Sequence, residues 1–304
     1  MSQISNLILA LNPVGYWKLD EESGLTVIDS SGSGIDGSYV GSVALGQSPF
    51  HSNAENSEKA ISLGGNGNIS IPYNPLIAAQ NPFTFFGLFK RLSNNVNQAF
   101  FHKGNFSSSG NQGAAFVAVA GGNILKIEGF SGGWYGADIA ELPDPSNDAF
   151  TLSICYPGGT SIKTCINGVE YETSIPVAIS GSASALVIGA NYSSGYYNKL
   201  IGGADEIAWF NRALASADLI DLHNAAFPPY VVHGVILDSS NQAVSRTVRA
   251  YRRDNGFYIG SALSSSATGE YSLNTYHAGE VQIVMLDDDP GNLENDQILR
   301  TSPV

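Results

Sequence analysis

Two short segments combine aromatic side chains with small polar residues, a composition chemically suited to binding sugars. The first runs from Phe130 to Gly136 and the second from Asn191 to Asn198. A sugar presents apolar ring faces and hydroxyl edges, so exposed Trp and Tyr rings flanked by Asn and Ser complement it. Protein contact surfaces favour the same aromatic residues, and a turn with one packed ring would also explain each segment. The candidate contact residues are Trp134, Tyr135, Tyr192, Tyr196 and Tyr197.

The residues that commonly bind metals do not show the spacing of a known site. The five histidines form no pair at helix or strand spacing. The run from Asp287 to Asn292 does not match an EF-hand loop, in which acidic residues alternate and are followed by Gly and a distant Glu. Pro290 and Gly291 interrupt that spacing. The sequence therefore predicts a solvated loop here.

Two cysteines, Cys155 and Cys165, lie in a segment with the pattern of a hairpin that turns at Pro157–Thr160. This register places them roughly 10 Å apart, since a strand rises ~3.3 Å per residue. A disulfide needs Cα atoms about 4.4–6.8 Å apart. We therefore predict two free thiols, which suits assembly in a reducing cytoplasm.

The charge balance excludes two classes of partner. The chain has 304 residues, a net charge of -13 and only 13% charged residues. A nucleic acid needs a basic face that neutralises its phosphates, and the one local basic group, Arg249, Arg252 and Arg253, fits a solvated strand face. Nucleic acid and anionic membranes are therefore excluded as main partners. No segment has the ~20 apolar residues that span a bilayer, and Asn6–Leu11 is predicted to be a short helix, not a signal peptide.

The elements that must position these residues are mostly short strands. Gly, Ser and Asn separate runs of alternating apolar residues, a pattern typical of sandwiches and barrels. Asn167-Gly168 predicts a two-residue hairpin turn, because both residues accept a positive φ. One helix is predicted over Ala213–His223, and Pro228-Pro229 behind it indicates a domain boundary near residue 229. Strands are expected beyond that boundary at Val231–Leu237, Val244–Arg252, Phe257–Leu263, Glu270–Leu273 and Val281–Leu286.

The two ends of the first region resemble laminin-G-like and concanavalin A-like jelly rolls. Val14–Glu21 (VGYWKLDE) and Asp29–Gly32 (DSSG) resemble the start of such a domain, and Gly203–Leu214 (GADEIAWFNRAL) resembles its end. The resemblance covers roughly residues 10–225 and implies a jelly-roll β-sandwich over residues 1–229. Trp17 and Trp209 fall within apolar strand patterns and are expected in its core.

The resemblance also implies two kinds of binding site. In this family an acidic residue at the start of the last strand can belong to a calcium site, with backbone carbonyls as further ligands. That residue corresponds to Asp205 here. The alternative is that Asp205 caps a turn and Glu206 pairs with Arg212. Jelly rolls of this kind also bind glycans at edge loops or on a concave sheet, which implies a glycan site at the aromatic segments.

Related jelly rolls include glycosidases, but this chain lacks their catalytic pattern. Those enzymes need two carboxylates flanking the scissile bond, and in the relatives they lie on one strand as Glu-x-Asp-x-x-Glu. Here Glu170 and Glu172 alternate on one predicted strand, which a hairpin edge also explains. No Gly-x-Ser-x-Gly elbow leads from a strand to a helix. We therefore expect no catalytic activity, and structural calcium is the only cofactor left open.

The second region, residues 230–304, resembles a small transthyretin-like or carboxypeptidase-regulatory-like β-sandwich. The resemblance rests on Val232–Asp238, Val248–Arg253 and Thr268–Leu273. Modules of this kind serve as spacers and docking units. The pairing of such a module with a jelly roll that lacks a signal peptide resembles tail-associated or capsid-decorating bacteriophage virion proteins.

The sequence as a whole predicts an all-β virion protein, assembled in the host cytoplasm and exposed on the particle surface. It would attach to a host-surface glycan or decorate the particle. Its partners would be other virion proteins and that glycan, and a homo-oligomer stays open. The alternative is a bacterial cell-surface carbohydrate-binding adhesion module, which neighbouring genes would distinguish. A third class, a polysaccharide-degrading enzyme, would be revealed by turnover.

Overall fold

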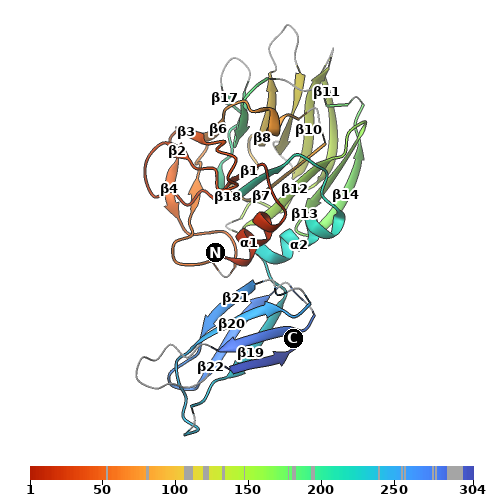
Figure 1. Ribbon diagram of the computed structural model, residues 1–304. Helices are drawn as coiled ribbons and strands as arrows, with labels where there is room; N and C mark the ends of the chain where they lie inside the picture. Colours follow the sequence, from red (N-terminus) through yellow and green to blue (C-terminus); the bar gives the residue numbers. More distant parts are fainter. Residues whose placement is uncertain are drawn as a thin grey trace. The chain divides into compact units, whose positions relative to one another are not determined.

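The computed structural model is all-β, as the sequence predicts, with only the helices α1 (Gln3–Ala10) and α2 (Ser216–Ala226) and the 3-10 turn η1 (Pro75–Ile77) among the described residues (Figure 1). Neither described helix combines the length and the apolar character needed to cross a membrane. The structure describes all residues except 53, 80–81, 106–111, 119–122, 132–133, 147, 177, 180–182, 193–195, 239, 255, 257, 276, 278 and 286–296. The side chains of residues 105, 112–113, 118, 129–131, 134–135, 192, 196 and 297–300 also lie outside the description.

The chain forms two compact units. The large unit comprises Ile8–Phe50 and Asn56–Ile220, and the small unit comprises Met1–Leu7, His51–Glu55 and Asp221–Val304. The small unit thus contains every strand after residue 229, together with two segments from the start of the chain and the end of α2. The predicted boundary near residue 229 stays a prediction.

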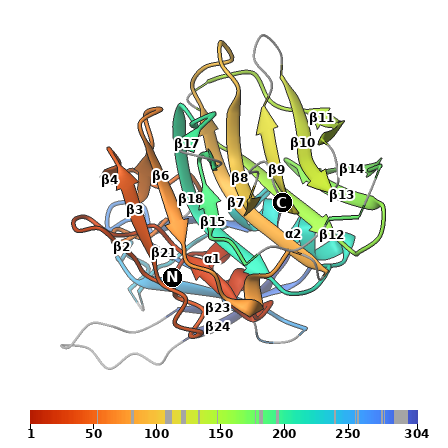
Figure 2. The ribbon, with the colours of Figure 1, turned by 90° about the horizontal axis from the view of Figure 1, so that it is seen from above.

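Two eight-stranded antiparallel sheets build the large unit (Figures 1 and 2). The first sheet has the order β14 (Val169–Ser174), β13 (Ser161–Ile166), β12 (Phe150–Tyr156), β7 (Phe83–Arg91), β18 (Gly202–Phe210), β5 (Ala60–Ser62) and β4 (Ala44–Gln47), with β1 (Gly15–Trp17) also paired to β18. The second has the order β11 (Trp134–Glu141), β10 (Ile124–Ser131), β9 (Gln112–Ala118), β8 (Gln98–Asn105), β15 (Leu186–Ile188), β6 (Gly67–Ile71), β3 (Gly37–Gly41) and β2 (Thr26–Val27). Neighbouring strands are often distant in sequence, as a jelly roll requires.

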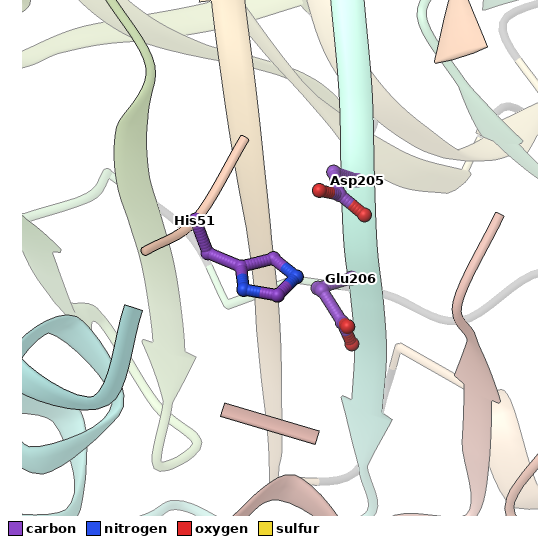
Figure 3. A group of neighbouring side chains, drawn as sticks. All are labelled: His51, Asp205 and Glu206. Atoms are coloured by element: carbon purple, nitrogen blue, oxygen red, sulfur yellow. The ribbon is translucent and has the colours of Figure 1, made fainter. Parts of the chain in front are cut away.

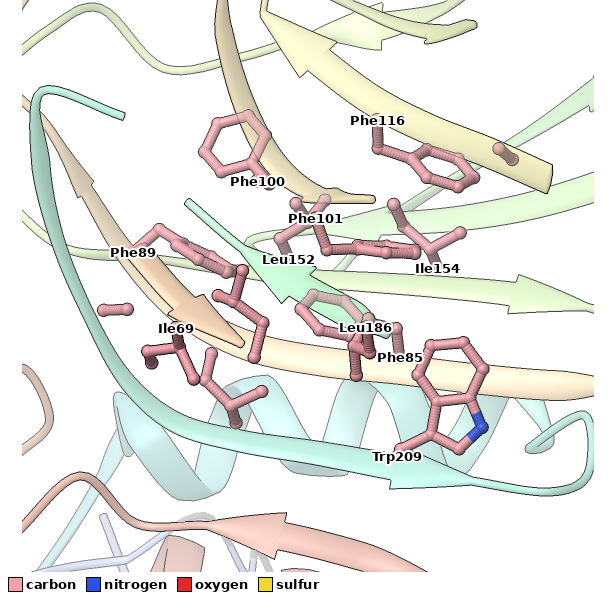
Figure 4. Packing of buried hydrophobic residues seen from close by; sticks show 14 of the residues in the cluster. Ile69, Phe85, Phe89, Phe100, Phe101, Phe116, Leu152, Ile154, Leu186 and Trp209 are labelled. Atoms are coloured by element: carbon pink, nitrogen blue, oxygen red, sulfur yellow. The ribbon is translucent and has the colours of Figure 1, made fainter. Parts of the chain in front are cut away.

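The facing sides of the two sheets enclose one aromatic core (Figure 4). Phe83 stacks on Trp209 with ring centroids 4.5 Å apart, and Phe101 stacks on Phe116 at 4.8 Å. Such pairs contribute about 0.5–1.5 kcal/mol beyond the area that they bury. Trp17 and Trp209 are fully buried, which confirms their predicted place in the core.

The loop after β2 is organised by one carboxylate. Asp29 Oδ1 accepts the backbone N–H groups of Tyr16 at 3.0 Å and Ser31 at 2.9 Å, and Oδ2 accepts that of Ile35 at 2.8 Å. Burial works against the charged form, but these hydrogen bonds outweigh it and lower the pKa of Asp29. Gly32 and Gly34 supply the positive φ angles that close the loop.

The helix α2 begins three residues later than the predicted Ala213. The segment before it is docked on the outer side of the first sheet, where the Leu214 N–H donates to Thr84 Oγ1 at 3.0 Å and the Cys155 thiol lies 3.7 Å from the Leu214 carbonyl oxygen. The Asp218 carboxylate accepts the Ala215 N–H at 3.2 Å, so the first turn is capped from within the helix.

The two cysteines lie on neighbouring strands but in different rows. Cys155 pairs with Lys163, and Cys165 pairs with Ser153. Both thiols are free and buried, which confirms the prediction. Burial is the main cause that raises the pKa of both thiols, to about 11 for Cys165.

In the small unit, a two-stranded and a four-stranded antiparallel sheet share one apolar core. The smaller sheet consists of β19 (Tyr230–Val235) and β22 (Glu270–Thr275), and the larger has the order β21 (Tyr258–Leu263), β20 (Thr247–Arg252), β23 (Val281–Met285) and β24 (Gln297–Thr301). All five strands predicted for residues 230–304 are present, and β24 is additional. The predicted solvated loop at 287–292 lies outside the described residues.

Candidate functional site

Most described residues of the two aromatic segments belong to two pairs of antiparallel strands. Trp134 opens β11 and pairs with Phe130, the penultimate residue of β10. The second segment forms the small hairpin of β16 (Asn191–Tyr192) and β17 (Tyr196–Tyr197), in which Tyr192 pairs with Tyr196. The side chains of Trp134, Tyr135, Tyr192 and Tyr196 lie outside the description, so Tyr197 is the one candidate whose side chain can be placed.

Tyr197 lies at an open depression of about 560 Å³ in the large unit. Its ring is 37% exposed, and the nearby Val96 side chain is 46% exposed. Amide groups and one ammonium group complete the surface. The lining residues are Gly65, Val96, Asn97, Tyr197, Asn198, Lys199 and Ile201.

Hydrogen bonds that involve backbone groups of several segments fix the wall of this depression. Asn198 adopts a positive φ of 49°, and its carbonyl accepts the Ala99 N–H at 2.7 Å. The Ile201 N–H donates to Gln98 Oε1 at 2.8 Å. Lys199 Nζ donates to the Asn66 carbonyl at 3.3 Å. The polar groups are therefore presented from a backbone that is already paired, which reduces the ordering cost of binding.

The environment keeps the phenol of Tyr197 neutral. Burial and then the Glu128 carboxylate raise the pKa of Tyr197. Burial also raises the pKa of Glu128, against the opposing effect of Lys126. The Lys126 ammonium is itself paired with Asp138 at 3.3 Å. A neutral phenol can both donate and accept a hydrogen bond, as a sugar hydroxyl requires.

Sequence analysis did not identify Val96, Asn97 or Lys199 as part of this site. Lys199 follows the aromatic segment directly, so a wider window around Tyr197 would have included it. Val96 and Asn97 come from the connection between β7 and β8, about 100 residues earlier in the chain. Only the fold brings them to Tyr197.

The predicted metal ligand Asp205 lies on β18 beside Glu206, where the strand has a bulge (Figure 3). Ala204 and Ile207 both belong to the core, so the bulge turns the two intervening carboxylates to the outer side of the sheet. Glu206 adopts a positive φ of 52°. His51, drawn in the same figure, belongs to the other compact unit.

The two carboxylates have different partners. Asp205 is fully buried; its Oδ2 accepts the Phe50 N–H at 2.8 Å, and its Oδ1 has no hydrogen-bond partner among the described residues. Glu206 accepts the hydroxyl of Tyr16. The alternative pairing of Glu206 with Arg212 is wrong, because Arg212 donates to backbone carbonyls of the segment after α1.

Negative charge accumulates around this pair. Lys18 lies 3.1 Å from Asp20 and 3.6 Å from the buried Glu58. Burial would lower the pKa of Lys18, but Glu206, Asp20 and Glu58 together raise it. Burial and then the charge of Glu206 raise the pKa of Asp205 well above its ordinary value. The Lys18 ammonium thus interacts with three carboxylates, and Asp205 adds a fourth acidic group whose raised pKa favours its protonated form or a bound cation.

Asp205 and Glu206 are the residues that could hold such a cation. Carboxylate oxygens are preferred ligands of calcium, and the buried Asp205 Oδ1 without a hydrogen-bond partner fits a metal ligand. The Lys18 ammonium supplies part of the compensation already. The alternative prediction was that Asp205 caps a turn. The carboxylate accepts one backbone N–H, that of Phe50.

Solved structures share this fold at low sequence identity. Domain 4 of an extracellular arabinanase from Geobacillus stearothermophilus, solved with arabinotriose, is 19% identical, with a TM-score of 0.52 over 70% of this chain and 98% of that chain. The binding domain of botulinum neurotoxin DC in complex with SialylT is 12% identical, with a TM-score of 0.54 over 97% of this chain and 78% of that one. The same binding domain with rat synaptotagmin II is 11% identical, with a TM-score of 0.53, covering 91% and 72%.

Sequence comparison agrees with the fold. No curated protein sequence matches this chain. A family model does match, over residues 63–219, which is about half of the chain; its region begins directly after the strand β5 and ends in the first turn of α2. The chain belongs to the laminin-G-like branch of the concanavalin A-like lectin/glucanases superfamily.

Proposed function

We propose that this protein is a lectin-like, non-enzymatic protein that binds a glycan at the Tyr197 depression. The observation that carries the proposal is the exposed Tyr197 ring set among amide groups and the Lys199 ammonium. Aromatic rings and amides together match the apolar faces and hydroxyl edges of a sugar. The arabinanase domain solved with arabinotriose and the neurotoxin domain solved with SialylT support the proposal by analogy of fold.

The lining of the depression also supports a binding role without catalysis. Glycoside hydrolysis needs a pair of carboxylates at the scissile bond. Among the described residues that line the depression there is neither an Asp nor a Glu. We therefore assign the site to recognition.

For the whole chain we propose a bacteriophage virion protein, tail-associated or capsid-decorating, that is exposed on the particle. The small unit, with its transthyretin-like sequence pattern, would act as a spacer or docking module to other virion proteins. A bacterial cell-surface adhesion module remains the alternative. Immunogold labelling of purified particles tests this directly: labelled virions support the proposal, and label confined to bacterial surfaces favours the alternative.

A structural calcium ion at Asp205 is a further part of the proposal. Its support is the fully buried Oδ1, which lacks a hydrogen-bond partner among the described residues, in a group with more carboxylates than ammonium groups. The ion would stabilise the first sheet and would not contact the glycan.

The glycan site is tested by replacing Tyr197. We expect the purified protein to bind host cells and arrayed glycans saturably. Tyr197→Ala should weaken binding by about tenfold or more, since truncating an aromatic residue that dominates a binding site costs about 2 kcal/mol or more. Tyr73→Ala is the matched control, because Tyr73 is 45% exposed but does not line the depression. Equal loss in both variants, or no binding to any glycan, would contradict the assignment.

A further inference from the structure

A second groove, of about 240 Å³, opens on the outer side of the first sheet. Lys90 follows the core residue Phe89 and Gly203 precedes the core residue Ala204, so both face away from the core. The loop after β4 supplies the opposite wall. The lining residues are Gln47, Ser48, Phe50, Ile61, Ser62, Lys90, Leu92, Gly202 and Gly203.

The floor and the wall of this groove depend on the absence of a side chain at residue 203. A Cβ atom on Gly203 would lie 2.6 Å from Phe50 Cζ, so the Phe50 ring rests directly on the backbone of β18. The buried Asp205 carboxylate accepts the Phe50 N–H at 2.8 Å and thereby fixes the position of the Phe50 backbone. Lys90 Nζ lies 4.4 Å from the centroid of that ring.

Among the described residues, each groove is lined by one lysine that makes no ion pair. The chain has seven lysines, all in the large unit. Four of them form ion pairs with carboxylates, and Lys103 is buried with its Nζ donating to the Ser184 carbonyl. Within the described part of the chain, Lys90 and Lys199 make no ion pair. Each of these two lines one groove.

Adjacent residues line the two grooves. Ile201 lines the Tyr197 depression, and the adjacent Gly202 lines the Lys90 groove. The Leu92 N–H donates to the Ile201 carbonyl at 2.8 Å, and Leu92, which lines the Lys90 groove, is 50% exposed. Because the two linings are joined at Ile201 and Gly202, an extended ligand can contact both grooves.

We propose that the ligand is an acidic oligosaccharide, whose carboxylates are recognised by Lys199 in the Tyr197 depression and by Lys90 in a second subsite. This inference rests on the proposed glycan-binding function and names its ligand class. In a chain with a net charge of -13, acidic groups greatly outnumber basic ones. Lys90 and Lys199 are partly exposed and have no carboxylate partner among the described residues. A carboxylate of the ligand would supply that partner, because hydrogen bonds between charged groups are stronger than those between neutral groups.

The second subsite also offers neutral hydrogen-bonding groups. Gln47 and the hydroxyls of Ser48 and Ser62 face the same groove as Lys90. A sugar ring placed there would meet an aromatic edge at Phe50, hydroxyl and amide partners on the walls, and the ammonium at one end. This is the combination expected for a uronic-acid or sialic-acid residue rather than for a neutral hexose.

The test uses the full chain and an array in which each uronic-acid or sialic-acid oligosaccharide is printed beside its carboxyl-reduced, neutral form, at two chain lengths. We expect the best ligand to be acidic and its carboxyl-reduced form to bind about tenfold more weakly. Lys199→Met should remove that preference for short and long ligands. Lys90→Met should weaken only the long ligands, and Lys90→Arg should restore them. Lys163→Met is the control, because Lys163 is already paired with Glu170 and lines neither groove.

The outcomes separate the two proposals. If neutral glycans bind as well as acidic ones, or if both lysine variants keep the preference, the acidic-ligand inference is overturned while the lectin function stands. If Lys90→Met weakens short and long ligands equally, the second subsite is overturned. If no glycan binds, the proposed function fails and this inference fails with it. Far-ultraviolet circular dichroism of each variant confirms that it is folded.

Discussion

At the scale of single residues, Asp29 shows how far one carboxylate can organise a loop. It accepts three backbone N–H groups, and its pKa is lowered by them. We expect Asp29→Ala to lower the free energy of unfolding by about 2 kcal/mol at neutral pH, because those buried donors lose their acceptor. Since the folded-state pKa is lowered, this contribution is complete above about pH 4 and is lost as the pH falls through the folded-state value.

Urea unfolding of the parent and of Asp29→Ala, at neutral pH and at acidic pH, measures this effect. The difference between the two proteins should shrink in acid. Asp138→Ala is the control, because its side chain is 69% exposed and paired only with Lys126; exposed pairs contribute about 0–1 kcal/mol. An Asp29 effect that does not change with pH would mean that its charge is not what holds the loop.

Asp205 gives a second prediction at the same scale. The pKa of Asp205 is raised in the folded state, so the unfolded chain releases this proton at a lower pH than the folded protein. In the absence of a cation, the free energy of unfolding therefore falls as the pH rises towards the folded-state pKa. Calcium should reverse this loss, by about 2.7 kcal/mol when its concentration is 100 times Kd. Scanning calorimetry with calcium and with EDTA should show a raised Tm for the parent and no calcium effect for Asp205→Asn.

Asp138→Asn serves as the matched control for this measurement and should keep the full response to calcium. A calcium shift that survives in Asp205→Asn would place the ion elsewhere. If calcium does not change the Tm of the parent, the calcium proposal is wrong, and Lys18 and a proton compensate the carboxylates.

At the scale of elements, the turn between β13 and β14 has the backbone that its sequence predicts. Asn167 and Gly168 adopt φ angles of 49° and 78°, and Asn167 Oδ1 also accepts the Thr151 N–H at 3.1 Å. Gly168→Ala should therefore cost about 1–2 kcal/mol, because a Cβ atom is disfavoured at positive φ. Gly136→Ala on β11 is the control: its φ is not positive and its added Cβ would make only ordinary contacts. Chemical denaturation of both variants provides the measurement, and equal effects would show that φ is not the cause.

The elements that the sequence predicted correctly are those whose signals are local. Asn167-Gly168, the strand runs and the buried Trp17 and Trp209 each follow from a few adjacent residues. The start of α2 was misplaced because Leu214, which fits a helical apolar face, instead packs on the outer side of the first sheet. The bulge at Glu206 was not predicted. Apolar residues lie on both sides of it, so the sequence gives no local sign that the inward and outward alternation of side chains is interrupted there.

At the scale of the molecule, the small unit is not built from residues 230–304 alone. It also contains Met1–Leu7 and His51–Glu55, and the buried Gln3 donates through Nε2 to the Asn274 carbonyl at 2.5 Å. A module of about 75 residues buries little more than ~60% of its unfolded surface and is marginal alone. We expect a 230–304 fragment to be cleaved by protease faster than the same residues in the full chain. Equal protection would show that the fragment folds without those segments.

The proposed binding surface could be predicted from the sequence only in part, for a reason that belongs to this largest scale. Tyr197 was proposed from the sequence because its aromatic neighbours are adjacent to it in the chain. Phe50, Lys90 and Gly203 were not found, because they come from three segments that only the jelly-roll topology brings together. The residue types suggest that the ligand is a sugar. The kind of sugar depends on which charged side chains the fold leaves without an ion-pair partner.

The bulge in β18 has a consequence for how this protein can change over evolution. Because Asp205 and Glu206 both turn outward while Ala204 and Ile207 both turn inward, the two halves of the strand are out of phase by one residue. A substitution here alters one side chain, whereas deleting Glu206 would send either Trp209 or Ala204 to the wrong side of the sheet. Descendants of this gene should therefore accept substitutions in this strand long before they accept the gain or loss of a single residue there.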